Sequence, residues 1–313
     1  MSNDPTHHNL HCAIIIGCGP SSLSAAIQLK RANIEFLMIA EEMGGLIRNA
    51  NLIENLLGFP NGVSGKKMAS IMQETIEKFE IPVIYAKVGD VKYDKKHYWL
   101  TTYYSLGTSL TELTFSCEYL IVGTGTVPNT LDIPGEDEAF NRHFLFYDIY
   151  KFTDNRDNLR IGIVGSGDAA YDYALNLVND SNSIEILQRG NTSNALSLLL
   201  NLVAEKSNIV VKSNTSIRKI KVAENQLNVE LETEHGPVSK NFDVIFVTIG
   251  RSPNISLLSP ELRELFLKGK DHEWLDAKLW FIGDMKNKQH RQLAIAMADG
   301  IKAAMEITAM LHK

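Results

Sequence analysis

Two glycine-rich loops, each joining an apolar strand to a helix, constrain the fold of this chain more than any other feature. In residues 13–42 the apolar run AIIIG leads into GCGPSS, and in residues 159–189 the run IGIVG leads into GSGDAA. In such a loop the first glycine permits a tight turn, and the second lets the backbone approach a pyrophosphate at the helix N-terminus. One loop is weak evidence, but two predict two βαβ nucleotide-binding units.

The first loop supplies Gly17 for the turn and Gly19 for the close approach to phosphate. Ser22 occupies the third glycine position, where a small side chain still allows the helix to pack closely. Glu41, at the end of the next strand, is predicted to bond the ribose hydroxyls, although it comes slightly late in the sequence. Cys18 lies inside the loop, where it either tolerates the turn or forms a reactive thiol beside the helix N-terminus.

Two further passages, residues 118–140 and 242–254, each run from an apolar strand through glycine to proline, and they bracket the second loop. Such passages are typical of crossings between domains. The sequence therefore predicts an α/β protein of two Rossmann-like three-layer domains, one inserted into the other. We expect the outer domain to comprise residues 1–126 and 247–313, and the inserted domain to comprise residues 127–246.

The C-terminal part contains a strand that ends at Gly283 and Asp284, and then a long helix that opens near Arg291 and Gln292. Asp284, at the carboxyl end of its strand, is placed to bond the polyol chain of a flavin nucleotide, or else it caps its own loop. The positive end of the helix dipole near Gln292 is placed to face the pyrimidine side of a flavin. There it would stabilise the anionic reduced ring.

Composition and charge exclude several classes of protein. The chain of 313 residues has a net charge of −6, and its Lys and Arg residues are scattered, so we expect no nucleic-acid binding. No apolar run reaches the ~18 residues that a membrane span needs. The three cysteines, Cys12, Cys18 and Cys117, form no short-spaced pair, which indicates a reducing compartment and predicts a cytoplasmic protein. No metal site is predicted.

The motifs together resemble the low-molecular-weight thioredoxin reductase family of flavoproteins. In order along residues 13–309 they read GCGPSS, EEMGGLI, IENLLGFPNGVSG, IVGTG, IPGEDEAF, GSGDAA, TIGRSPN and GDMKNKQHRQ. The resemblance implies an FAD domain built from both ends of the chain and an inserted NAD(P)H domain. It also implies a homodimer and hydride transfer from nicotinamide to the flavin N5 atom.

The glycine loops and the resemblance together predict two sets of cofactor contacts. The residues predicted to contact FAD are Gly17, Gly19, Pro20, Ser21, Glu41, Gly44, Gly45, Leu46, Asn55, Gly125, Gly283, Asp284, Arg291, Gln292 and Leu293. The residues predicted to contact NADPH or NADH are Gly165, Gly167, Asp168, Ala169, Asp172, Arg189 and Gly250.

One feature of the family is missing from this sequence. Reductases of the family carry a Cys-x-x-Cys pair about 17 residues before the second glycine loop, where this chain has Asp148, Ile149, Tyr150 and Lys151. Exchange with a disulfide needs an attacking thiolate and a second, resolving thiol. We therefore expect this chain not to reduce thioredoxin. Asp148 and Lys151 either form an (i, i+3) ion pair at a helix start, or Asp148 acts as an acid or base on a non-thiol substrate.

The second nucleotide site also departs from the family. Members that prefer NADPH carry a His-Arg-Arg run and a further Arg for the 2′-phosphate, whereas this chain has Gln188, Arg189 and Gly190, then Asn194. One guanidinium remains, and no carboxylate at the strand end selects NADH. The choice between NADPH and NADH therefore stays open. Asp172 stands where the family usually has Glu, which keeps a carboxylate near the nicotinamide.

The sequence thus predicts an FAD-dependent oxidoreductase without the redox dithiol. NAD(P)H would reduce FAD, and the reduced flavin would pass electrons to a non-disulfide acceptor: a small molecule, a quinone, oxygen, or a redox protein of the ferredoxin or flavodoxin type. One alternative is a flavin-dependent oxidase or dehydrogenase of a small metabolite, with a vestigial NAD(P) site. A second alternative is a flavin-binding module without catalytic activity.

Overall fold

The chain folds into two compact units, which are described one at a time. The computed structural model describes residues 10–106, 109–154, 157–269, 274 and 276–312. The first unit comprises the chain up to Arg48, residues 54–127 and the chain from Pro253 onward, and the second comprises residues 49–53 and 128–252.

A seven-stranded sheet forms the centre of the first unit, in the order β3-β2-β1-β6-β5-β4, with β17 beside β6. Its strands are β1 (Leu10–Cys18), β2 (Phe36–Met43), β3 (Val83–Tyr85), β4 (Lys87–Tyr93), β5 (Tyr98–Leu106), β6 (Ser109–Val122) and β17 (Leu279–Phe281). Strands β1, β2, β3, β6 and β17 run parallel, whereas β4, β5 and β6 are antiparallel. The apolar run in β1 is buried on both faces, as expected for a central parallel strand.

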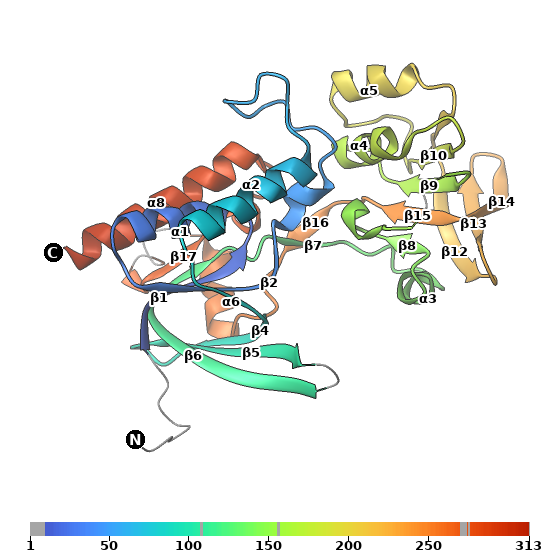
Figure 1. Ribbon diagram of the computed structural model, residues 1–313. Helices are drawn as coiled ribbons and strands as arrows, with labels where there is room; N and C mark the ends of the chain where they lie inside the picture. Colours follow the sequence, from blue (N-terminus) through green and yellow to red (C-terminus); the bar gives the residue numbers. More distant parts are fainter. Residues whose placement is uncertain (1–9, 107–108, 155–156, 270–273, 275, 313) are drawn as a thin grey trace. The chain divides into compact units, whose positions relative to one another are not determined.

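Helices cover this sheet and connect its strands. They are α1 (Pro20–Arg31), α2 (Gly65–Lys78), α6 (Pro260–Lys268) and α8 (Leu293–Leu311), with 3₁₀ turns η1 (Gly45–Asn49) and η3 (Gly283–Met285). Helices α1 and α8 lie side by side on one face of the sheet (Figure 1). An apolar cluster that includes Trp274 and Phe281 fills the space between the strands and α6. Because α1 follows the first glycine loop and packs against α8, residues from the N-terminal and C-terminal parts of the chain both position this loop.

The second unit is a three-layer sandwich around a five-stranded parallel sheet, in the order β11-β10-β9-β15-β8. The strands are β8 (Leu145–Phe146), β9 (Arg160–Val164), β10 (Ser183–Leu187), β11 (Ile209–Lys212) and β15 (Val244–Val247). Helices α4 (Asp168–Leu177) and α5 (Ser197–Ala204) cover one face. The other face packs against α3 (Glu136–Asn141) and an antiparallel sheet of β12 (Ser216–Val222), β13 (Leu227–Thr233) and β14 (Gly236–Phe242). The predicted α/β architecture with two nucleotide-binding folds is confirmed.

The chain passes between the units along two strands that pair with each other, β7 (Thr126–Pro128) and β16 (Arg251–Pro253). The observed division differs from the predicted one in three respects. The first crossing falls after Val127 rather than after residue 126. The second crossing falls after Ser252 rather than after residue 246, because Thr248 still donates its backbone N–H to the Val164 carbonyl at 2.8 Å. In addition, residues 49–53 belong to the second unit, which no local sequence signal predicts.

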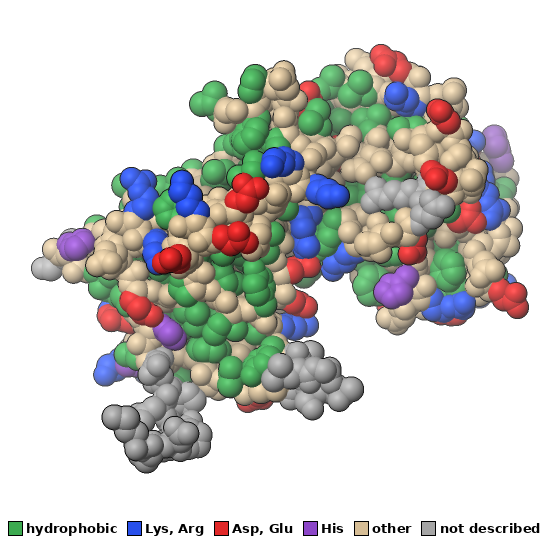
Figure 2. Space-filling view, in the orientation of Figure 1, with side chains coloured by type: hydrophobic (Ala, Val, Ile, Leu, Met, Phe, Trp, Pro, Cys, Tyr) green, Lys and Arg blue, Asp and Glu red, His purple; other side chains and the backbone are tan. Residues whose placement is uncertain are grey.

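The charged surface is mixed in sign. On the face shown in Figure 2, Lys and Arg side chains are interspersed with Asp and Glu. No helix in the described part of the chain combines the length and the apolar character that crossing a bilayer requires.

Candidate nucleotide sites

The first glycine loop has the backbone geometry that a phosphate site requires. Gly17 has a φ of +101°, and a Cβ atom there would lie 2.4 Å from the Gly123 carbonyl oxygen, so only glycine fits. Gly19 is the N-cap residue of α1, and no side chain caps this helix end. A Cβ atom on Gly19 would meet nothing within 4 Å. The N-terminus of α1 is therefore an open cradle that fits a pyrophosphate.

The residues that follow β2 lie against this loop. The backbone N–H of Gly44 donates to the Cys18 carbonyl at 2.8 Å, and a Cβ atom on Gly45 would lie 3.7 Å from the Gly19 Cα. Both glycines have positive φ angles, which explains the glycine pair at this turn. Leu46 lies in the 3₁₀ turn η1, which begins at Gly45, and Glu41 is exposed on β2.

Cys18 points into the protein and is almost fully buried. Burial raises the pKa of its thiol to about 11, although a hydrogen bond from the Gly44 backbone acts in the opposite direction. The thiol is therefore protonated at neutral pH, which argues against the reactive-thiol interpretation and favours a residue that tolerates the turn.

Ser21 and Ser22 let α1 pack closely on its neighbours. A Cβ atom on Gly283 would lie 2.6 Å from Ser21 Oγ, and one on Gly300 would lie 1.9 Å from the Ser21 carbonyl oxygen. Ser22 Oγ is buried without a hydrogen-bond partner among the described residues. At this third glycine position a small side chain is needed because a Cβ atom on Gly123, which follows β6, would lie 2.3 Å from Ser22 Oγ.

Residues from distant parts of the chain meet at the start of α8. Asn55 Nδ2 donates to Gln292 Oε1 at 2.6 Å, and Gln292 is the N-cap residue of α8. No side chain caps this helix end, so its N–H groups are available to a ligand. The loop before the helix is held by Asp299, whose carboxylate accepts the backbone N–H of Gly283 at 3.1 Å and the amide of Asn287 at 2.6 Å.

Both interpretations of Asp284, as a ligand of the polyol chain and as a cap of its own loop, stay predictions. Asp284 and Arg291 are half-buried beside this loop. All the residues predicted to contact FAD lie in the first unit, including Pro20, Gly125 and Leu293.

The second glycine loop repeats the geometry of the first. Gly165 has a φ of +150°, and a Cβ atom there would lie 2.3 Å from Thr248 Oγ1. Gly167 is the N-cap residue of α4 without a side-chain cap, and a Cβ atom on it would meet nothing within 4 Å. Asp168 Oδ1 accepts the backbone N–H of Leu196 at 2.8 Å, which holds the following loop beside the helix end.

The end of β10 carries one exposed cation. Arg189 and Asn194 are exposed, whereas Gln188 is buried and its amide nitrogen donates to Ser213 Oγ at 2.9 Å. The Gln188 side chain is thus turned away from a ligand at the strand end, and Arg189 is left as the group able to bond a 2′-phosphate. Ala169 is exposed on α4, and Gly250 has a φ of +99°. All the residues predicted to contact NAD(P)H lie in the second unit.

A buried polar cluster surrounds Asp148, at the position where the family resemblance predicts a dithiol. Asp148 Oδ1 accepts Arg251 Nη1 at 3.0 Å and Asn49 Nδ2 at 2.8 Å, and the Asp148 side chain is 11% exposed. The carboxylate is thus paired with Arg251 and not with the exposed Lys151, whose ammonium lies over the Tyr150 ring. The ion pair between Asp148 and Lys151 was therefore a wrong interpretation.

Two neighbours of this cluster have shifted pKa values. Burial raises the pKa of Asp172, whose Oδ2 accepts the backbone N–H of Asn51 at 3.1 Å. Burial also raises the pKa of Tyr173, and the Asp148 carboxylate acts in the same direction. Tyr147 points elsewhere, since its hydroxyl donates to the buried Glu136 at 2.7 Å. Sequence patterns did not single out Asn49, Asn51 or Arg251, because these partners are far from Asp148 and Asp172 in the chain.

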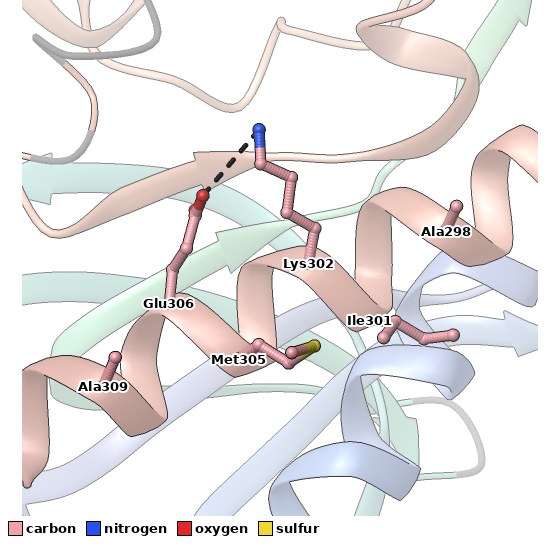
Figure 3. A pocket seen from close by; sticks show the side chains of 6 residues that line it. All are labelled: Ala298, Ile301, Lys302, Met305, Glu306 and Ala309. Atoms are coloured by element: carbon pink, nitrogen blue, oxygen red, sulfur yellow. Dashed lines mark ion pairs between the residues drawn. The ribbon is translucent and has the colours of Figure 1, made fainter.

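A groove of about 410 Å³ lies on α8, apart from the predicted contact residues (Figure 3). It is lined by Ala298, Ile301, Lys302, Met305, Glu306 and Ala309. Lys302 and Glu306 form an ion pair at 3.7 Å on one side of it. Its lining is apolar apart from this pair, and it contains none of the groups that the two glycine loops would present to a nucleotide.

Known proteins resemble this chain over almost its full length. Glucosaminate ammonia-lyase from Pseudomonas fluorescens is 26% identical and covers 94% of this chain and 93% of its own. Thioredoxin reductase from Escherichia coli O157:H7 is 25% identical, with 94% of each chain covered. The crystal structure of Lactococcus lactis thioredoxin reductase in its FR conformation superposes with a TM-score of 0.81 at 23% identity, covering 96% of this chain and 99% of that one.

These likenesses confirm the thioredoxin reductase-like fold that the motifs predict. The family model described as pyridine nucleotide-disulphide oxidoreductase matches residues 12–300, which is most of the chain. The chain therefore belongs to the pyridine nucleotide-disulphide oxidoreductase family.

Proposed function

We propose that this protein is an FAD-dependent oxidoreductase in which NAD(P)H reduces FAD and the reduced flavin passes electrons to a non-disulfide acceptor. The observation that carries the proposal is the pair of open helix ends at Gly19 and Gly167, one in each unit. Each end combines a glycine turn, unsatisfied N–H groups and the positive pole of a helix dipole, which together favour a pyrophosphate. Bound FAD would supply the hydride and electron chemistry, which no side chain provides.

The chain's own groups would hold the two nucleotides. The first unit presents the Gly19 cradle, the Asn55–Gln292 pair and the uncapped start of α8 to FAD. The second presents the Gly167 cradle and Arg189 to NADPH or NADH. Because residues 188–194 contain no cation besides Arg189 and no carboxylate, we propose that the site discriminates weakly between the two. The homodimer and the cytoplasmic location stay predictions.

The test is anaerobic mixing of the purified yellow protein with NADPH or NADH, following the visible absorbance of the flavin. Bleaching by either nucleotide within the time of a catalytic turnover is the expected result. If neither nucleotide bleaches the flavin, the reductase is contradicted. If the purified protein is colourless and does not bind added FAD, every flavin-dependent function is contradicted. Boiled protein with free FAD is the control for bleaching that the chain does not catalyse.

A second candidate is a flavin enzyme that oxidises a small metabolite directly. The single exposed cation at the end of β10 favours it, because a vestigial nicotinamide site would lose such groups first. One similar protein is named glucosaminate ammonia-lyase, so a relative of this chain is named for an activity on a small metabolite and not on thioredoxin. This alternative would be established if a metabolite bleaches the flavin and neither NADPH nor NADH does.

Thioredoxin is not expected to be a substrate. Asp148 and Lys151 replace the dithiol, and burial raises the thiol pKa of Cys12, Cys18 and Cys117. With oxidised thioredoxin and NADPH we expect no turnover above the rate without protein, because neither an attacking nor a resolving thiolate is supplied. An authentic thioredoxin reductase, assayed in parallel, is the positive control. Turnover at a comparable rate would contradict the non-disulfide acceptor.

A further inference from the structure

The segment Asn49–Ile53 belongs to the second unit, although the residues on both sides of it belong to the first. Its side chains and backbone bind carboxylates of the second unit. Asn49 Nδ2 donates to Asp148 Oδ1 at 2.8 Å, and Asn51 donates its backbone N–H to Asp172 Oδ2 at 3.1 Å. The segment is thus held at two points, by bonds that are partly shielded from water.

Both the nitrogen and the oxygen of the Asn49 side-chain amide form hydrogen bonds. Its oxygen accepts the backbone N–H of Tyr150 at 3.4 Å, while its nitrogen bonds Asp148. Asp148 itself is fixed by Arg251, and the two side chains are 11% and 19% exposed. The carboxylate is thus held by Arg251 on one side while it accepts the Asn49 amide on the other, so it is a firm anchor for Asn49.

The anchors lie at one edge of the parallel sheet. Asp148 follows β8, Arg251 follows β15, and Asp172 lies on α4, which follows β9. These three strands are neighbours in the order β9-β15-β8, and β10 lies on the other side of β9. In open parallel sheets, ligands bind outside the carboxyl ends of the strands, at the point where connections diverge to the two sides. That point is between β9 and β15.

A nucleotide crevice at this edge would therefore have two halves. The half beside β9 and β10 contains the open N-terminus at Gly167 and the exposed Arg189. Asn49 reaches the half beside β15 and β8 through Asp148, and Asn51 bonds Asp172 on α4 at its border with the other half. A dinucleotide bound through its pyrophosphate at Gly167 extends into both halves.

We infer that Asn49–Ile53 is a strap that closes the β15–β8 half of the crevice and is displaced when a nicotinamide nucleotide binds. The inference rests on the proposed function, since it takes the crevice of the second unit to be a nicotinamide site. Only molecules in which the strap is open bind the nucleotide, so the apparent Kd equals the intrinsic Kd divided by the open fraction. We call the hydrogen bonds of the Asn49 side chain to Asp148 and Tyr150 the latch of this strap. Asp148 stands where the family resemblance predicts the first cysteine of the dithiol.

The experiment uses the full-length protein loaded with FAD and measures amide hydrogen exchange in peptides that cover residues 49–53. Asn49→Ala removes both side-chain hydrogen bonds of the latch and leaves the Asp148–Arg251 pair intact. We expect exchange of these amides to rise about tenfold, as the loss of two hydrogen bonds of ordinary net strength implies. We expect the Kd for NADPH or NADH to fall by up to the same factor. Adding the nucleotide to the unsubstituted protein is also expected to raise exchange there.

Asn241→Ala is the control, because it makes the same substitution in the same unit and removes a side-chain hydrogen bond from Asn228 on the three-stranded sheet. It is expected to leave exchange at 49–53 and the nucleotide Kd unchanged. The strap is refuted if Asn49→Ala leaves exchange unchanged, if exchange rises without a fall in the Kd, or if the nucleotide protects residues 49–53.

Failure of the strap and failure of the proposed function give different results. Bleaching of the flavin together with protection of residues 49–53 keeps the reductase and overturns the strap. A nucleotide that binds and raises exchange without bleaching the flavin keeps the strap and overturns the reductase. Absence of nucleotide binding in both the unsubstituted protein and Asn49→Ala overturns both.

Discussion

Replacing Gly19 with valine is expected to abolish FAD binding and leave the protein folded. Gly19 has a φ of −86° and a ψ of −179°, which valine adopts without strain, and its Cβ position is open. The added side chain would occupy the space that a pyrophosphate needs in order to reach the N–H groups of α1. Losing two such bonds, at roughly 1.5–3 kcal/mol each, weakens FAD binding by about a hundredfold or more.

Gly167→Val is the matched variant, because Gly167 has almost the same backbone conformation, with a φ of −101° and a ψ of −178°. We expect it to retain FAD and to lose bleaching by both nicotinamides. The measurements are the flavin-to-protein absorbance ratio after purification and titration of apoprotein with FAD, with circular dichroism to verify folding. If both variants keep FAD and bleach like the parent protein, the glycine loops are turns without ligands.

The second large effect is expected from Gly300→Val, this time on stability. A Cβ atom on Gly300 would lie 1.9 Å from the Ser21 carbonyl oxygen and 3.0 Å from the Ala25 backbone nitrogen. Both contacts are to the backbone of α1, so no side-chain rotation relieves them, and α1 and α8 have to separate. We expect the free energy of unfolding to fall by about 3 kcal/mol or more, the upper part of the range for overpacking. Urea unfolding followed by far-UV circular dichroism measures this loss.

Ala298→Val is the control for Gly300→Val, since Ala298 is exposed on the same helix. Its expected cost is below about 1 kcal/mol, from the lower helix propensity of valine alone. Because α1 positions the first glycine loop, Gly300→Val should also release FAD at lower denaturant concentrations than Ala298→Val. Equal stability of the two variants would show that α1 and α8 are not packed as closely as described.

The strand–glycine–helix units were predictable because their signals are local. The apolar run before Gly17 and the small residues after it determine a turn that has few alternatives, and the same holds at Gly165. The meeting of Asn55 with Gln292 was implied only by the family resemblance. These residues are 237 positions apart, and no periodicity connects them.

The partners of Asp148 were not predictable for the same reason. Spacing from the second glycine loop identified its position, and local reasoning offered Lys151, three residues away. The carboxylate instead pairs with Arg251 and Asn49, at separations of 103 and 99 residues. Burial decides the outcome: a carboxylate beneath the surface requires a partner that is also shielded, and the exposed Lys151 provides none.

The location of Asn49–Ile53 also bears on how this protein can be divided. The second unit is not one continuous stretch of chain, so residues 128–252 expressed alone would lack five of its residues. In that fragment Asp148 would lose the Asn49 amide, and the Asp172 carboxylate would lose the Asn51 N–H. An exchange of this module between homologous proteins, in the laboratory or in evolution, must therefore carry the short piece along with the long one.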